Sequence, residues 1–463
     1  MEKITPQSEQ QQSLDARWYR EFEIINSQND VIECLDGDKE YRSRERDLFE
    51  SGEKRNPDLD YPEINIESLE KEESELLSLK QAIINEESDE VIKQAYRWRI
   101  NEKIAEIRML KAAASGDMKR FKRYAEFVYG KPSKDIFYLS ITEIYEQIHK
   151  TENSEDESVA KVSRELKDLL PKPEESITLP EKPSSELIQT IHEIFEQEWQ
   201  SLNLPKIDSD VIEDEVVAKV FERALDSVGA NNWQVIIDEN RTRVNVSQEQ
   251  ELIKVPKDRT INYPKLKTLV MHEIKRHVER RIRGEDSKLS LLGLGLDRYI
   301  RGEEGVAKVT EQGTEGEFKT FATPEMHVAI GLALGIDGKE RDFREVYEIL
   351  IRHFFLKIIR IQSAKEQHTN TEEALRAAKD KAWSHCVRAF RGTDCKTKGV
   401  AYTKDIVYRE GTIAVWHLVS QDVSEVYRFS IGKYDPTNQR HLWVLSQLGI
   451  TDKALKEVDE FTS

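Results

Sequence analysis

Apolar residues recur at helical spacing through most of the N-terminal part of the chain. A helix with one apolar stripe is predicted after Ser13, which suits the N-cap position. The apolar positions of this stripe are Leu14, Trp18, Phe22 and Ile25. Residues 66–114 continue the helical pattern. Roughly fifty residues exceed the usual length of a globular helix, so we predict a helical hairpin there.

The helical pattern is interrupted at residues 151–185, where the sequence is first acidic and then rich in proline. Proline lacks an amide donor and disfavours a long helix. We therefore predict a linker at 151–185, after a helical N-terminal region at 1–150. Residues 1–12 are rich in Gln and Ser without an apolar pattern, which is typical of a frayed tail.

A change of period predicts a small sheet in the second half of the chain. Helical patterns at 184–203 and 208–228 precede a stretch in which apolar and polar residues alternate, as in half-buried strands. The alternating apolar residues are Val235, Ile237, Val244 and Val246. A helix is predicted next, from Tyr263 to about Arg283, with Gly284 as its left-handed C-terminal residue. The rest is mostly helical, so the predicted fold class is α+β, mostly helical, with the small sheet beside this helix.

Composition narrows the class of protein. Hydrophobic residues make up 38% and charged residues 34% of the 463, which indicates a folded and strongly solvated chain. The formal net charge of −18 argues against a nucleic-acid binder, since such binding depends on clustered Lys and Arg. We find no signal peptide and no membrane-spanning stretch, and the three cysteines do not form a disulfide framework. We therefore expect a cytoplasmic protein without a nucleic-acid or membrane partner.

Two histidines and a glutamate on the predicted helix are candidates for metal chemistry. In LVMHEIKRHVERR, His272 and His277 offer imidazole ligands and Glu273 offers a general base beside them. Glu304, in GEEGVAKVTEQ, offers a carboxylate that completes a three-ligand site with one open position. The alternative is that an isolated HExxxH in a charged helix contains two ordinary surface or core histidines.

The spacing of the two histidines imposes a geometric requirement. Residues four apart in an ideal helix differ by about 40° around its axis, and residues five apart differ by about 140°. His272 and His277 are five apart, so both imidazoles reach one metal only if the helix is locally widened by a π-bulge. We therefore predict a π-bulge between them. A regular helix at this point would exclude the metal site.

Several separated sequence blocks point to a known family. They are KRNPDLDYP (54–62), HEIKRH (272–277), EEGVA (303–307), FRGTD with AYTKDIVYREG (390–411), and SIGKYDPTNQRHLWVLSQLGI near the end. Together and in this order, they resemble the microtubule-associated tyrosine carboxypeptidase family and its bacterial relatives, which carry a QEGLA motif and are described as flavohaemoglobin expression modulators. The resemblance implies a zincin-like metallopeptidase core. It also implies removal of a C-terminal aromatic residue, Tyr or Phe, as one activity of the family.

The resemblance assigns roles to individual residues. It implies that His272, His277 and Glu304 bind Zn²⁺ and that Glu273 is the catalytic carboxylate. The sequence departs from the family pattern at Val306, where leucine is usual. It departs again between the histidines, at KR (275–276), where small or uncharged residues are common.

Other residues are candidates for contact with the substrate. Arg388, Arg391 and Lys404 are cations suited to a terminal carboxylate, although ordinary solvated cations are equally expected. Tyr408 is either a proton donor to a developing oxyanion or a packed strand residue. Glu311 lies about two helical turns beyond the third ligand, on the same face, and is either an orienting partner of a histidine ligand or an exposed carboxylate.

Taken together, these features predict a zinc-dependent carboxypeptidase that acts on the C-terminus of a peptide or protein. Its catalytic domain is predicted at 186–463. One alternative is a noncatalytic regulatory or interaction protein that keeps the fold. Another is a metal-dependent hydrolase of a nonpeptide amide. Nothing in the sequence indicates a microtubule partner.

Overall fold

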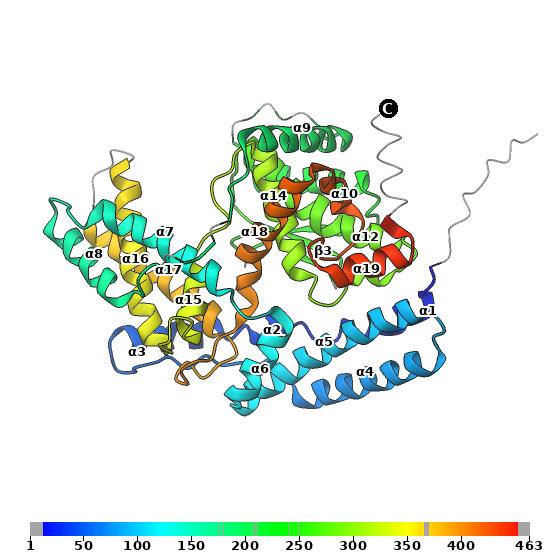
Figure 1. Cartoon of the computed structure of the whole chain (residues 1–463), viewed down its shortest axis with the longest axis horizontal. Helices are drawn as coiled ribbons and strands as arrows, with labels where there is room; N and C mark the ends of the chain where they lie inside the picture. Colours follow the sequence, from blue (N-terminus) through cyan, green and yellow to red (C-terminus); the bar gives the residue numbers. More distant parts are fainter. Residues whose placement is uncertain are drawn as a thin grey trace, which may run out of the picture.

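Helices dominate the computed structural model, and a three-stranded sheet lies among them (Figure 1). The structure describes residues 13–451 except 175, 179, 206, 208, 210, 240, 249 and 365–369. The predicted α+β, mostly helical class is confirmed. The tail predicted at 1–12 lies outside the described residues. Within them, none of the helices combines the length and the hydrophobicity that a bilayer crossing requires.

The lower group of helices in Figure 1 surrounds the first of three apolar clusters. It consists of α1 (Ala16–Asn26), α2 (Val31–Leu35), α4 (Ile66–Glu86), α5 (Glu90–Ser115) and α6 (Met118–Tyr129). Two further helices, α13 (Leu291–Leu294) and α19 (Gln439–Gln447), add buried residues to this cluster, and α19 lies above the lower group in Figure 1. The predicted helical hairpin is confirmed as α4 and α5. Helix α1 starts at Ala16 rather than after Ser13, and Leu14 is 55% exposed. Leu14 therefore does not belong to the buried stripe, because it precedes the first helical turn.

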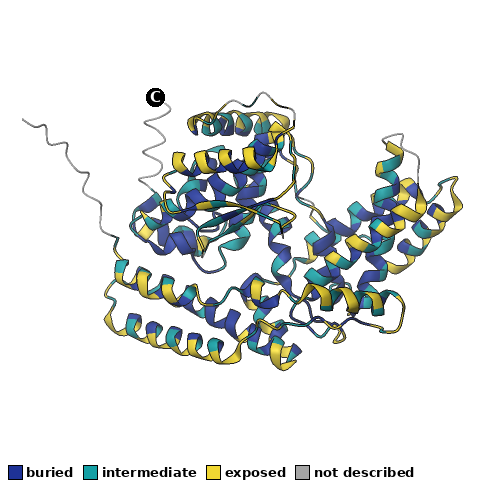
Figure 2. Ribbon diagram, turned by 180° about the vertical axis from the view of Figure 1, so that it is seen from behind, coloured by how far each residue is buried: buried dark blue, intermediate teal, exposed yellow. Residues whose placement is uncertain are grey.

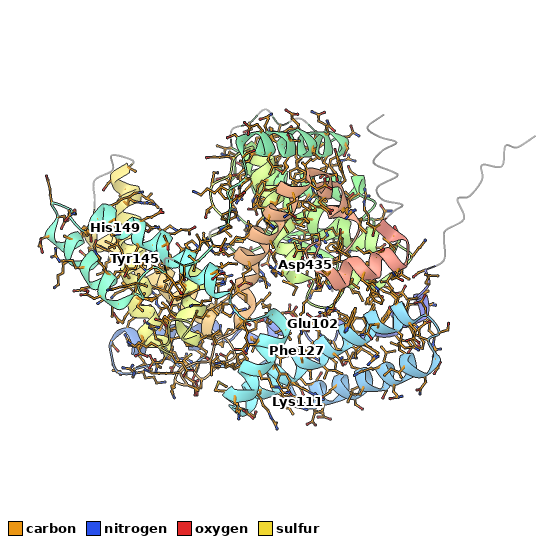
Figure 3. All side chains as sticks on the ribbon, in the orientation of Figure 1. Glu102, Lys111, Phe127, Tyr145, His149 and Asp435 are labelled. Atoms are coloured by element: carbon orange, nitrogen blue, oxygen red, sulfur yellow. The ribbon has the colours of Figure 1, made fainter. Side chains whose placement is uncertain are left out.

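The left-hand group surrounds the second cluster. It consists of α3 (Lys39–Glu50), α7 (Lys134–Thr151), α8 (Glu157–Leu169), α15 (Glu325–Leu334), α16 (Phe343–Ala364) and α17 (Thr371–Phe390). Figure 3 labels Tyr145 and His149 on α7 here, and Lys111 and Phe127 on the lower group. Helix α8 lies within the predicted linker and buries Val159 and Leu166 in this cluster.

The third group contains the sheet and the predicted metal-binding helix. Its elements are α9 (Ser185–Ser201), α10 (Asp214–Ser227), β1 (Gln234–Asp238), β2 (Asn245–Ser247), β3 (Leu252–Pro256), α11 (Tyr263–His272), η1 (Glu273–Val278), α12 (Glu279–Glu285), α14 (Ile300–Glu315), α18 (Ile406–Gln421) and η3 (Val423–Ser430). The short η2 (Thr403–Asp405) leads into α18. Helices were predicted at 184–203 and 208–228. The first matches α9, whereas the second, α10, begins only at Asp214, because Ile212 pairs with Ile261 in a β-bridge.

The sheet has the strand order β1-β3-β2. Strand β1 runs parallel to β3 and β2 runs antiparallel to it, so Val235 and Val246 flank Ile253 on either side. Ile253 and Leu266 of α11 are both fully buried in the third cluster. The sheet and α11 therefore share one core, as the alternation of apolar residues predicted.

Segments far apart in sequence share the first two clusters. The first joins residues of α1, α2 and α4–α6 to Leu291 and Val444, and the second joins Phe49 and Phe137 to residues of α15–α17. Dark buried residues accordingly continue between the groups in Figure 2. The predicted domain boundaries, at residue 150 for the N-terminal region and at residue 186 for the catalytic domain, remain sequence predictions. The apolar clusters contain residues from both sides of these boundaries.

Candidate metal centre and active site

The segment from α11 to α12 changes its helical pitch at the predicted position. Asn262 caps α11 by accepting a hydrogen bond from the Lys265 amide at 3.0 Å. The α-helix ends at His272, and Glu273–Val278 forms a π-helical turn before α12. This confirms the predicted π-bulge. Gly284 does not end the helix in a left-handed turn as predicted. It lies inside α12, where a Cβ would fall 2.3 Å from the Leu292 carbonyl carbon, so close packing explains the glycine.

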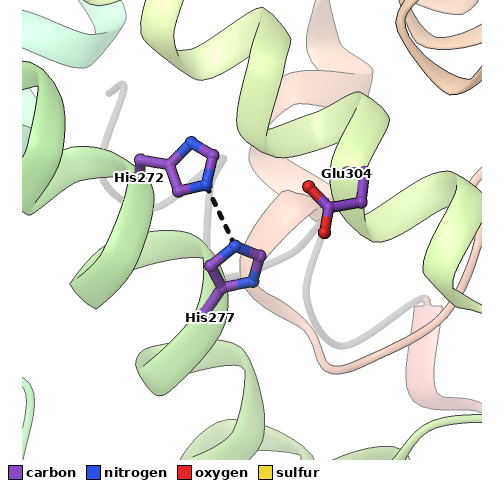
Figure 4. A group of neighbouring side chains, drawn as sticks. All are labelled: His272, His277 and Glu304. Atoms are coloured by element: carbon purple, nitrogen blue, oxygen red, sulfur yellow. Dashed lines mark hydrogen bonds between the residues drawn. The ribbon is translucent and has the colours of Figure 1, made fainter. Parts of the chain in front are cut away.

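The wider turn brings the two histidines to one point. Their Nε2 atoms lie 3.1 Å apart, as the dashed line in Figure 4 marks. Glu304 approaches them from α14, and one ligand atom from each of the three residues lies within 4.8 Å of the others. In the part of the chain that the structure describes, this is the one group of His, Cys, Asp or Glu side chains with spacing suited to a metal. The residues predicted as ligands from the sequence are thus brought together.

A carboxylate holds the outer nitrogen of each histidine. Nδ1 of His272 lies 2.7 Å from Oε1 of Glu311, and Nδ1 of His277 lies 2.9 Å from Oε1 of Glu303. The contact of His277 is a hydrogen bond, which places its ring proton on Nδ1 and leaves a lone pair on Nε2. The contact of His272 is at ion-pair distance without hydrogen-bond geometry. Two Nε2 atoms 3.1 Å apart are at hydrogen-bond distance, so a proton or a metal cation has to lie between or beside them. The donor set therefore suits a divalent metal that accepts nitrogen and oxygen ligands.

Charges around Glu303 keep this carboxylate ionised. Burial alone would raise its pKa, but Lys433, His277 and Arg280 outweigh burial and lower the pKa to about 2. The same contact shifts the pKa of His277 in the opposite direction. Burial alone would lower the pKa of His277, and the hydrogen bond to Glu303 outweighs it and raises the pKa. The negative electrostatic potential of the ionised Glu303 carboxylate therefore favours positive charge beside it.

Glu311 has a similar environment. Burial would raise its pKa, but His272 and Lys308 hold the pKa of this carboxyl well below its usual range. Both oxygens of Glu311 accept from Nζ of Lys308, at 3.0 and 2.9 Å. The orienting role of Glu311 remains a prediction: its carboxylate lies at ion-pair distance from His272, but Nδ1 of His272 forms no hydrogen bond with the described residues.

The three potential ligands open into a cavity of about 680 Å³. Glu273, Tyr408 and Lys404 line it together with His272 and His277. Tyr408 lies on helix α18 and not on a strand. Its pKa is raised well above the ordinary value, first by the charge of Glu304 and then by burial. The phenol therefore keeps its proton and can donate a hydrogen bond.

Two of the three predicted substrate-binding cations lie outside this lining. Nε of Arg388 donates to Asp405 at 2.8 Å, and Nη2 of Arg391 lies 3.3 Å from Asp36. Both guanidinium groups are therefore engaged by carboxylates. Lys404 differs, because it lines the cavity and forms no ion pair with the described residues. Of the three, Lys404 is the one that lines the cavity, and its contact with a terminal carboxylate stays a prediction.

The basic pair between the histidines is structural. Arg276 is fully buried, and its guanidinium donates to Thr310 at 2.7 Å and to Glu198 at 2.6 Å. Lys275 forms an ion pair with Glu279. The charges that depart from the family pattern are thus each paired with a carboxylate.

Several residues of the site escaped the sequence analysis. The sequence pattern assigned no role to Glu303, although adjacent residues face about 100° apart on a helix and two carboxylates can therefore serve different partners. Arg280 is fully buried and donates to the Gly432 and Tyr434 carbonyl oxygens at 2.8 and 2.7 Å. It joins α12 to the C-terminal segment. No local sequence pattern indicates a contact of this kind.

One of three comparisons with known proteins gives a match. A family model described as microtubule-associated tyrosine carboxypeptidase matches residues 139–355 and 368–455, which is well over half of the chain. The matched ranges include the π turn, α14 and α18. Searches of curated proteins and of solved structures give no match. The chain therefore belongs to the microtubule-associated tyrosine carboxypeptidase family.

Proposed function

We propose that this protein is a zinc-dependent carboxypeptidase that hydrolyses the last peptide bond of a peptide or protein. The observation that carries the proposal is the convergence of the two histidine Nε2 atoms, 3.1 Å apart, beside Glu304. Family membership supports the reaction class, because the family is named for a carboxypeptidase. We propose in addition that the core is zincin-like and that an aromatic last residue is a preferred substrate.

His272, His277 and Glu304 would hold the zinc ion. Bound zinc supplies Lewis acidity, which polarises a peptide carbonyl and makes water more acidic. Glu273 lines the cavity beside these residues. It takes a proton from the attacking water as the oxygen adds to the carbonyl carbon, and it delivers that proton to the amine as the C–N bond breaks. Glu273 thus ends the cycle ionised, as it began.

Two further residues stabilise and position the substrate. Tyr408 keeps its proton and donates a hydrogen bond to the carbonyl oxygen as negative charge develops there. Lys404 lines the same cavity and pairs with the terminal carboxylate, which places the last peptide bond over Glu273.

Metal content tests the ligand assignment. We expect about one zinc per chain by mass spectrometry of the purified protein, because three protein ligands and one open position are typical of a catalytic zinc site. The double variant His272→Ala, His277→Ala should lose it. His417→Ala is a matched control, because His417 is exposed and contacts Gln421 at 3.0 Å. Undiminished zinc in the double variant would contradict the assignment.

Activity tests distinguish an enzyme from a noncatalytic protein with the same fold. Glu273→Gln should keep its zinc and lose on the order of 10²-fold or more in kcat, because general-base catalysis contributes at least that factor.

Amidation of the peptide end should abolish the contribution of Lys404 to substrate binding. Lys404→Met should therefore slow the cleavage of free-acid peptides and leave the rate on amidated peptides unchanged. Equal cleavage of both peptide forms by the unmodified protein would exclude carboxylate recognition.

A further inference from the structure

One wall of the cavity comes from outside the segment that defines the family. The family match begins at residue 139. Four residues in and next to the short helix α2 nevertheless line the cavity, namely Asp30, Ile32, Glu33 and Asp36. The N-terminal helices therefore contribute directly to the space where the substrate is proposed to bind.

The position of α2 is set by its buried face. Val31, Cys34 and Leu35 are buried in the first apolar cluster. Nζ of Lys103 donates to the Asn29 carbonyl at one end of the helix at 3.0 Å. Nη2 of Arg42 donates to the Leu35 carbonyl at the other end at 2.9 Å. With both ends and the buried face held, the opposite face is presented to the cavity in one orientation.

Helix α2 lies beside the segment that leads to Lys404. Asp36 pairs with Arg391 at 3.3 Å. A Cβ at Gly392 would lie 3.4 Å from a methyl carbon of Leu35. Tyr402, two residues before Lys404, is buried in the same apolar cluster as Leu35, so the α2 wall and the proposed carboxylate-binding lysine lie on neighbouring parts of the cavity lining.

The start of α14 and the loop residue before it supply apolar surface to the cavity. Tyr299 and Ile300 line the cavity, and Ile300 and Ile32 pack against the first apolar cluster. Helix α5 holds both elements at neighbouring positions, because Lys103 binds the chain before α2 and Glu102 accepts from the Arg298 amide at 2.9 Å. Glu102 is labelled on this helix in Figure 3. Ile32 and the loop are therefore anchored by one turn of α5.

We propose that Ile32, together with Tyr299 and Ile300, forms the pocket that receives the side chain of the substrate's last residue. Helix α2 then selects large apolar or aromatic ends. The inference rests on the proposed function. Its physical basis is the nearness of this apolar surface to Lys404, since the carboxylate and the side chain of a terminal residue are attached to the same carbon atom.

A peptide series tests the pocket. The peptides are identical except for the last residue, which is Tyr, Phe, Leu or Ala. Ile32→Ala should lower kcat/KM for the Tyr and Phe peptides about tenfold relative to the Ala peptide, because removing methylene groups from an apolar specificity pocket has an effect of this size. Ile32→Phe, which fills the pocket, should shift the preference toward the Ala peptide. Ile64→Ala is the matched control, since Ile64 packs on the same cluster but does not line the cavity.

Binding separates this inference from the proposed function. In a Glu273→Gln background, calorimetry measures the affinity for the same peptides without turnover. Tighter binding of the Tyr peptide than of the Ala peptide, lost in Ile32→Ala, supports the pocket even if the unmodified protein cleaves none of them; that result overturns only the proposed activity. An unchanged Tyr-to-Ala preference in Ile32→Ala, or an equal change in Ile64→Ala, overturns the pocket.

Discussion

At the scale of single residues, the site depends on which nitrogen of each histidine carries the proton. Glu311 and Glu303 lie at Nδ1 of His272 and His277, at 2.7 and 2.9 Å, and the two Nε2 atoms face each other on the opposite side of the rings. Both carboxylates come from α14, which also carries Glu304. One helix therefore provides a proposed ligand and the two groups that orient the other ligands.

This arrangement predicts a loss of metal affinity when an orienting carboxylate is removed. Glu311→Ala should weaken zinc binding by about 10- to 100-fold, because the His272 ring loses the partner that sets its orientation and proton position. Competition with a chromophoric chelator measures the affinity. Glu315→Ala is the control on the same helix, since Glu315 is exposed and pairs with Lys319 at 2.8 Å. Equal affinities of the two variants would argue against the orienting role.

At the scale of elements, the close crossing of α14 and α18 places Glu304 opposite Tyr408. A Cβ at Gly305 would lie 2.4 Å from the Gly411 carbonyl oxygen. The glycine of the EEGVA block therefore allows two helix backbones to approach. The π turn acts in a comparable way within one helix, because it rotates His277 toward His272.

Gly305→Ala should separate α14 from α18 and move Glu304 away from the Tyr408 hydroxyl. We expect a loss of about 1–3 kcal/mol in the free energy of unfolding, as for other overpacked positions, and a strong loss of peptide cleavage. Urea unfolding and kcat/KM are the measurements. Gly116→Ala controls for backbone strain alone, because Gly116 has φ +70° and a Cβ there would meet nothing within 4 Å. It should cost about 1 kcal/mol and keep full activity. A Gly305→Ala protein as stable and active as the original would refute the packing argument.

At the scale of the whole molecule, the N-terminal helices and the family-matched part share apolar cores. Trp18 and Phe22 of α1 belong to the same cluster as Leu292 and Leu445. Removal of α1–α6 would expose that surface to water.

A chain that begins at residue 139, where the family match starts, should therefore fail to fold as a soluble monomer. We expect aggregation or the loss of a cooperative thermal transition, followed by circular dichroism and analytical ultracentrifugation. A chain that begins at residue 13 keeps every described helix and serves as the control. A soluble, cooperatively folding fragment from residue 139 would show that the shared core is dispensable.

The sequence by itself determined the local features of this protein. Periodicity predicted the α4–α5 hairpin and the strands before α11, because the side-chain pattern of a helix or strand repeats within a few residues. The five-residue spacing of His272 and His277 required a π turn, since that requirement follows from helix geometry alone. The boundaries of α1 and α10 were less accurate, because tertiary contacts such as the Ile212–Ile261 bridge set them.

Only the tertiary structure decided which distant groups meet at the site. Glu303 and Glu304 are neighbours in sequence, yet one contacts Nδ1 of His277 and the other faces the Nε2 side. Similarly, Arg388 and Lys404 are both cations in the same family-like block, but a carboxylate engages the first and the second lines the cavity. The α2 wall is contributed by residues more than two hundred positions before the histidines. Such pairings depend on how the helices pack together, and no periodicity within one segment records that packing.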